Sequence, residues 1–325
     1  MSLVDVFPQD PFTPSLRYAA VQKLPITVPW NNESIKLGTP LIVSQTEKST
    51  FKEEKCAFSR ASLASSRLTF VSSARGSVCE SATSSAAASS EHLNLSVQGQ
   101  IGWKLLGGSG QARYETSVKD DKNDLKSSLR VEYRSGTLTF AHVPRLSAEA
   151  FHILQTSPEP QQAFQKEFGE YYVGAYILGG ANVNMVSASS ASWSKSKDLS
   201  GSYTVNFLWS STTKPLDDHE RSGNLFGNVA LSAYDSLDGW QENKSGAGNT
   251  TYLDIVRSAD DNKLRGWALA KRVTRKAKEL KVEKGSEVSW DMCDTICKAG
   301  LVVEVLLLPY AGLRDYTSAL LSAGV

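Results

Sequence analysis

Apolar and small polar side chains alternate over two stretches of this chain, at 93–103 and 201–209. An alternation with a period of two residues predicts a β-strand with one apolar face. Each stretch is close to the roughly 9 to 11 residues that a tilted strand needs to cross a bilayer, although a half-buried strand of a water-soluble sheet shows the same pattern. The pattern alone leaves both readings open. The candidate membrane-facing residues are Leu93, Leu95, Val97, Ile101, Trp103, Tyr203, Val205, Phe207 and Trp209.

Both stretches lie in or beside serine-rich segments. The chain contains 44 serines, and they are concentrated between Cys56 and Ser128 and between Ser187 and Ser211. Apolar residues such as Leu68 are too frequent there for a flexible linker. Serine, alanine and glycine commit weakly to helix or strand, so such segments can pack in one form and pair in another.

Composition excludes several classes of protein. The 35 basic and 34 acidic residues argue against a strongly basic nucleic-acid binder, and four cysteines in 325 residues argue against a disulfide scaffold. No run of 18 apolar residues encodes a membrane helix. The N-terminal sequence MSLVDVFPQDPF lacks the features of a secretory leader, so we expect a cytoplasmic protein, or one secreted by a leaderless route, that is membrane-associated when active.

Between the serine-rich segments, local signals predict ordinary elements. Ser147 has the features of a helix N-cap, and a second helix should start near Pro160 and end at Gly169. Ser135-Gly136 predicts a tight hairpin turn. The remaining expected elements are strands at 111–118, 129–133, 137–142, 171–180 and 301–310, with a closing helix at 313–321.

The succession SSLRVEYRSGTLTF, LSAEAFHIL and AFQKEFGEYYVGAYILGG resembles the membrane attack complex/perforin (MACPF) family. That family has an aromatic-Gly-Thr-His-aromatic stretch followed by Leu-Gly-Gly. Glu170 and Tyr171 replace the Thr and His of this pattern. The matching residues, which the resemblance assigns to the family motif and the sheet bend, are Phe168, Gly169, Tyr172, Leu178, Gly179 and Gly180.

The resemblance implies an α+β fold, a bent, twisted antiparallel sheet flanked by helical clusters. Residues 1–50 would form an N-terminal extension of loops and short strands, and 51–325 the MACPF-like domain, with inserting segments at about 57–118 and 182–250. The implied function is that of a pore-forming cytolysin or toxin that binds a lipid membrane, assembles as a homo-oligomeric ring and converts both segments to β-hairpins. A second protein could supply lipid targeting, as in fungal two-component members. The alternative is a non-lytic cytosolic binding or scaffold protein.

A strongly basic segment, KLRGWALAKRVTRKAKELKVEK, runs from Lys263 to Lys284. Its apolar stripe predicts one amphipathic cationic helix. Such a helix suits anionic lipid or nucleic acid, and a solvated helix face explains it equally well. No nucleic-acid-binding motif accompanies it, which favours lipid or an acidic partner. The candidate lipid contacts are Lys271, Arg272, Arg275 and Lys276.

No motif points to an enzyme. The four histidines lack metal-ligand spacing, and neither a nucleophile elbow nor a phosphate loop is present. Cys293 and Cys297 would share a helix face, where buried, reduced thiols are a simpler reading than a metal site. We therefore expect no catalytic residues, no metal and no cofactor.

Overall fold

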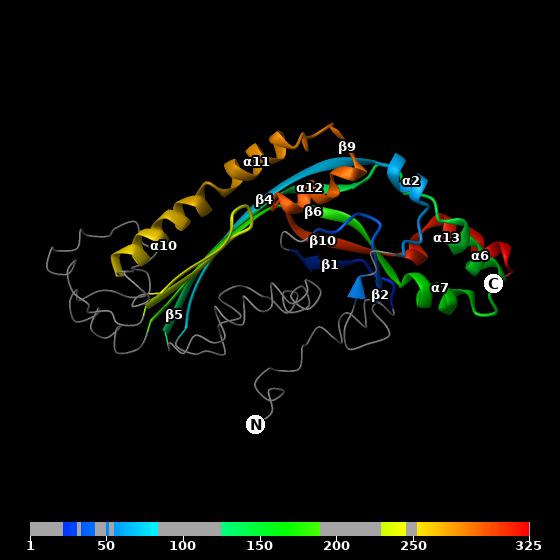
Figure 1. Ribbon diagram of the computed structural model, residues 1–325, viewed down its shortest axis with the longest axis horizontal. Helices are drawn as coiled ribbons and strands as arrows, with labels where there is room; N and C mark the ends of the chain where they lie inside the picture. The colour runs from blue at the N-terminus through cyan, green and yellow to red at the C-terminus, as the bar shows by residue number, and fades with distance from the viewer. Residues whose placement is uncertain are drawn as a thin grey trace, which may run out of the picture.

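The computed structural model describes residues 22–30, 34–42, 50–51, 55–83, 125–188, 229–244 and 252–324. Within these ranges, ten strands form one bent sheet in which every pairing is antiparallel (Figure 1). The strands are β1 (Ile26–Pro29), β2 (Pro40–Ile42), β3 (Thr50–Phe51), β4 (Arg67–Thr83), β5 (Leu125–Phe140), β6 (Tyr171–Ala188), β7 (Val229–Asp235), β8 (Gly239–Lys244), β9 (Glu287–Ser289) and β10 (Val302–Pro309).

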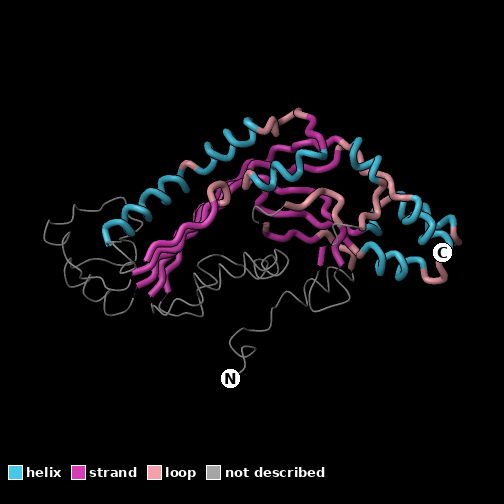
Figure 2. The backbone as a smooth tube through the Cα atoms, viewed as in Figure 1, coloured by secondary structure: helices cyan, strands magenta, loops and turns pink. Residues whose placement is uncertain are grey.

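Three long strands, β4, β5 and β6, form the spine of the sheet and curve together along the length of the molecule (Figure 2). At one end the strand order is β1-β10-β6-β5-β4-β9. At the other end β7 takes over the outer side of β6, and β8 pairs with β7. The predicted bent antiparallel sheet is therefore confirmed.

The ladders of neighbouring strands are interrupted at the same level of the sheet. β4 shifts register between Ser72 and Arg75, and β5 shifts between Arg134 and Gly136. The predicted hairpin at Ser135-Gly136 is thus wrong, because β5 runs through this pair as a bulged strand. A Cβ on Gly136 would lie 2.3 Å from the Val71 carbonyl oxygen, so this glycine permits close approach of two strands.

The double glycine of β6 lies inside the strand, which continues to Ala188, and the prediction that the strand ends there is wrong. A Cβ on Gly179 would lie 2.0 Å from the Tyr133 carbonyl oxygen. A Cβ on Gly180 would lie 2.8 Å from both Leu269 Cδ1 and Val273 Cγ2. The glycines therefore let a neighbouring strand and a covering helix approach β6.

Most helices of the described ranges gather at one end of the sheet or lie along its face (Figure 1). Those helices are α2 (Arg60–Ser65), α6 (Ala148–Thr156), α7 (Pro160–Phe168), α10 (Tyr252–Trp267), α11 (Leu269–Glu279), α12 (Cys293–Lys298) and α13 (Arg314–Ser322). The predicted Ser147 cap is confirmed, since its Oγ accepts a hydrogen bond from the Ala150 N–H at 3.1 Å. Gly169 ends α7 with φ of +80°, as predicted.

The basic segment forms two helices that lie nearly end to end along the sheet (Figure 1), so the prediction of one helix is wrong. The break falls at Ala268, and α11 ends at Glu279. The predicted apolar stripe is confirmed: Leu269, Val273 and Ala277 are buried, and α11 packs on β5 and β6.

The buried apolar residues of the described ranges form one hydrophobic core. β1 and β2 belong to the same sheet, through pairing with β10 and β6. In the range 57–118, residues 60–65 form α2 and 67–83 form β4. In the range 182–250 the described residues form the end of β6, then β7, β8 and the turn 236–238 between the last two. All nine candidate membrane-facing residues lie outside the described residues.

Candidate functional site

The six motif residues occupy two places in the fold. Phe168, Gly169 and Tyr172 lie where α7 leads into β6. There the ring of Tyr172 meets that of Phe58 edge to face, with centroids 5.0 Å apart. Burial raises the pKa of Tyr172 to about 12, so its hydroxyl stays protonated. This corner is a packing site.

Leu178, Gly179 and Gly180 lie in β6 beside the register shift of β5 at Arg134/Gly136, and Gly180 faces α11. Near them Arg134 of β5 reaches across β6 to Glu304 of β10, with Arg134 Nη2 2.5 Å from Glu304 Oε1. Because Gly179 carries no side chain opposite Arg134, the two charged groups can meet over β6. An ion pair thus links three neighbouring strands, β5, β6 and β10, at this level of the sheet.

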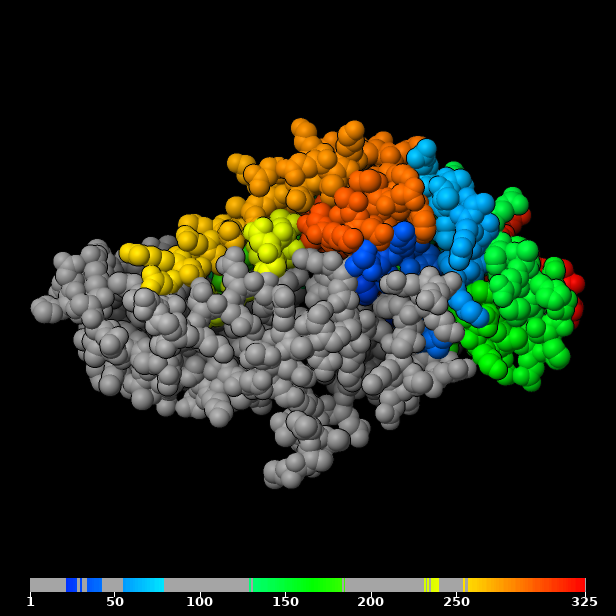
Figure 3. All heavy atoms as spheres, viewed as in Figure 1, coloured from blue at the N-terminus to red at the C-terminus, as the bar shows by residue number. Residues whose placement is uncertain are grey.

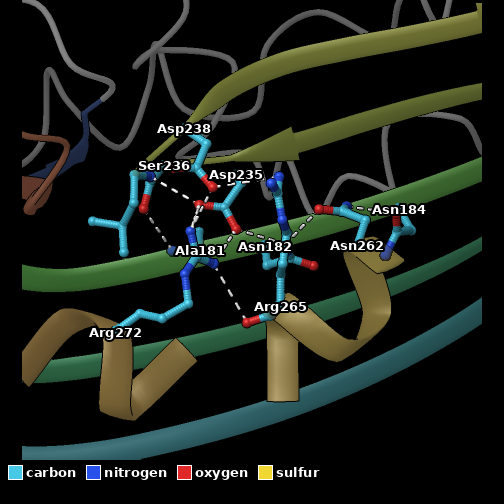
Figure 4. A network of polar contacts seen from close by, with 10 residues as sticks. Ala181, Asn182, Asn184, Asp235, Ser236, Asp238, Asn262, Arg265 and Arg272 are labelled. Carbon is cyan, nitrogen blue, oxygen red and sulfur yellow. Dashed lines mark hydrogen bonds and ion pairs between the residues drawn. The ribbon is translucent and has the colours of Figure 1, made fainter. Parts of the chain in front are cut away.

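A buried polar network lies between the sheet and α10 (Figure 4). Asn262 of α10 donates to Asn184 Oδ1 at 2.6 Å, and Asn182 Nδ2 donates to Asn262 Oδ1 at 3.0 Å. Asn182 Nδ2 also donates to Asp235 Oδ2 at 2.7 Å. All four side chains are almost fully buried. Amide groups therefore hold α10 to β6, and Asn182 links this contact to Asp235 of β7.

The network continues through Arg272 of α11 (Figure 4). Arg272 donates to both carboxylate oxygens of Asp235, at 2.6 Å and 3.1 Å, and to Asp238 Oδ2 at 2.7 Å. Its side chain is 15% exposed. The guanidinium fork matches the carboxylate in the bidentate manner typical of strong arginine pairs. Arg272 thus binds the end of β7 and the turn that follows it. We no longer propose it as a lipid contact.

The other three cations of that set are differently placed. Lys271 and Arg275 are exposed, and Lys276 is half-buried. Arg275 Nε lies 3.9 Å from Glu279 Oε1, one helical turn away, and its side chain is 75% exposed. Such an exposed pair is worth about 0 to 1 kcal/mol. These three cations remain available to an external anion.

A pocket of about 860 Å³ lies beside the loop at 34–39 and is lined by Lys55, Cys56, Arg60 and Trp290 among others. Cys56 donates its thiol to the Gly38 carbonyl oxygen at 3.1 Å. Burial raises the pKa of Cys56 to about 11, so the thiol is protonated at neutral pH and is not an activated nucleophile. No group of three metal-binding side chains occurs in the described ranges.

Sequence reasoning missed the network because its partners are distant in the chain. Asn182 and Asn184 alternate with Ala181 and Val183, which is typical of a solvated strand face. Their burial depends on α10, about 80 residues later. Gly266 lets α10 approach the network, since a Cβ there would lie 2.8 Å from Asn182 Oδ1.

The antiparallel sheet with its flanking helices confirms the α+β fold predicted from the sequence. Similar solved structures include GNIP1Aa from Chromobacterium piscinae, with 14% identity and a TM-score of 0.33 over 79% of this chain and 46% of that one. A MAC/perforin-domain protein from Bacteroides thetaiotaomicron has 12% identity and a TM-score of 0.27 over 68% and 54%. Stonustoxin has 11% identity and a TM-score of 0.39 over 92% and 34%.

This chain spans at most 54% of the length of those three proteins. No protein-family model matches the chain, and no curated protein matches it significantly. Within the described ranges, every helix is too short or too polar to cross a bilayer.

Proposed function

We propose that this protein binds membranes, assembles into rings and forms pores by converting parts of the segments 57–118 and 182–250 into β-hairpins. The observation that carries the proposal is a pair of open sheet edges. On β4, β9 covers only Arg67–Thr69, and no described strand pairs with the outer side of residues 71–83. On the opposite side, β8 is the last strand in the described residues.

Open edges of this kind favour assembly. Unpaired backbone groups on an edge strand are a template for pairing with another chain. Because the two open edges differ, β4 of one copy would meet β8 of the next, and a head-to-tail contact generates a ring when its rotation closes. All side chains from Val71 to Val78 are exposed, so no described element shields this edge.

Two of the long strands, β4 and β6, each end shortly before one of the alternating stretches in the sequence. β4 ends at Thr83, ten residues before the first alternating stretch, and β6 ends at Ala188, before the second. An isolated hairpin cannot satisfy its edges in lipid, whereas a barrel closed by many subunits can. Ring assembly would therefore precede insertion.

Dye release from vesicles tests the function. A histidine-tagged protein attached to vesicles through nickel-chelating lipid needs no targeting partner, so release and rings in electron micrographs are expected. Rings without release would favour the non-lytic scaffold alternative over pore formation. Absence of both from tethered protein would contradict the proposal as a whole. Release only from tethered protein would support a second protein for lipid targeting.

A proline in the open edge tests the mode of assembly. Ala74 lies in the β4 bulge, where the ladder with β5 is already interrupted, so Ala74→Pro should fold. It should lose rings and dye release while vesicle attachment stays unchanged. Ala74→Ser keeps the N–H group and is the matched control. Thermal unfolding verifies the fold, and normal rings from a folded proline variant would contradict edge pairing.

A further inference from the structure

An exposed line of side chains follows the outer side of α10 and α11, opposite the stripe that packs on the sheet. We call it the outer ridge, and it consists of Leu264, Trp267, Lys271, Arg275 and Lys278. The spacing of three or four residues places all five on one side of the helix pair. α11 lies at the upper margin of the molecule in Figure 3.

The charge of the outer ridge is available to a ligand. Within the described residues, Lys271 and Lys278 form no ion pair, and Arg275 has the weak contact with Glu279 described above. Arg265, beside the ridge, forms an ion pair with Asp238, with its Nη1 3.4 Å from Asp238 Oδ2. Asp260 and Asp261 lie before Leu264, so the ridge ends there in acidic groups. The cationic part therefore runs from Lys271 toward the end of α11.

The apolar part of the ridge identifies the kind of partner. Leu264 is 59% exposed and Trp267 is 55% exposed. The buried Lys263 places its Nζ 4.7 Å from the centre of the Trp267 ring, so the protein contacts one face of an indole that is otherwise exposed. A tryptophan beside lysines is typical of side chains at a membrane interface. A phosphate backbone would attract the cations but give the leucine no apolar environment.

We propose that the outer ridge docks onto an anionic lipid surface, with Lys271, Arg275 and Lys278 among the headgroups and Trp267 and Leu264 at their base. The apolar stripe of α11 stays on the sheet, so contact requires no unfolding of the helix. This inference rests on the proposed function, because it names the surface through which that function reaches its membrane.

Vesicle co-sedimentation tests the ridge. The double variant Lys271→Glu/Arg275→Glu should weaken binding to phosphatidylserine-containing vesicles at least about 25-fold, since each cation near such a surface contributes about a factor of five. The matched control, Arg145→Glu/Arg314→Glu, changes the same number of exposed charges far from the ridge and should bind as the unmodified protein does. Trp267→Ser should weaken binding even at high salt, where charge is screened.

The outcomes separate this inference from the proposed function. Unchanged binding by the Lys271→Glu/Arg275→Glu variant, or an equal loss in the control, would overturn the ridge as a lipid site. When the same variant is tethered through nickel-chelating lipid, dye release should return to that of the tethered unmodified protein. Failure of the tethered unmodified protein to release dye would count against pore formation and leave the binding result standing.

Discussion

At the scale of single residues, Arg272 shows how burial separates two carboxylates that contact the same guanidinium. The Asp235 side chain is 2% exposed, and that of Asp238 is 40% exposed. A charge left unpaired in a buried site carries the desolvation penalty without the compensating attraction, whereas water replaces an exposed partner. The two aspartates should therefore differ in their contribution to stability.

Asp235→Asn should lower the free energy of unfolding by about 3 kcal/mol or more, because it leaves Arg272 without its buried counter-ion. Asp238→Asn should lower it by about 0 to 1 kcal/mol. Urea denaturation of both variants beside the unmodified protein measures the difference. Equal losses would show that the burial of Asp235 does not control the pair.

At the scale of elements, α10 and α11 contact the same sheet with different chemistry. α11 buries Leu269, Val273 and Ala277, whereas α10 contributes Asn262 to an amide network. Within the described residues, Asn182 Oδ1 and Asn184 Nδ2 are buried without a hydrogen-bond partner. Each such atom costs about 1 to 3 kcal/mol. The contact of α10 is therefore the weaker one.

Amide hydrogen exchange should detect this difference. α10 should exchange faster than α11 under native conditions, because local opening of α10 exposes polar groups that water can satisfy. Asn262→Ala should speed exchange in α10 and leave α11 nearly unchanged. Equal protection of both helices in the unmodified protein would mean that they open as one unit.

Elements were predictable where the signal is local. Ser147, Pro160 and Gly169 fixed helix ends through their own chemistry, and the structure confirms all three. Ser135-Gly136 failed because a serine-glycine pair suits a bulge as well as a turn. The register shift of β4 between Ser72 and Arg75, at the same level of the sheet, shows that this pair forms a bulge and not a turn. The pairing of Arg272 with Asp235 was equally unpredictable, since its partner is the last residue of a strand 37 residues away in the sequence.

At the scale of the whole molecule, buried thiols make stability depend on pH. Burial raises the pKa of Cys56 and Cys293 to about 11, and that of Cys297 to about 12. In an unfolded chain, thiols ionise near their ordinary pKa of about 8.5. The folded state thus favours the protonated thiol. Its stabilising contribution is complete below about pH 8.5 and is lost as the pH rises toward 11 to 12.

The free energy of unfolding, measured by urea denaturation, should therefore fall as the pH rises above about 8.5, by up to about 1.4 kcal/mol per pH unit for each thiol. A Cys293→Ala/Cys297→Ala variant should be less stable at neutral pH through lost packing, but its decline with pH should be shallower. An identical slope in both proteins would assign the decline to other groups.

The aligned bulges also limit what a change of curvature can do. A bulge adds a residue to one strand, and flattening the sheet does not remove it, so the ladders on either side of the bend keep their registers relative to each other. Leu68 therefore stays opposite Phe140, and Val78 opposite Val131, whatever the angle between the two halves. The angle between the two halves of the sheet can therefore change while the pairing of residues on neighbouring strands stays the same.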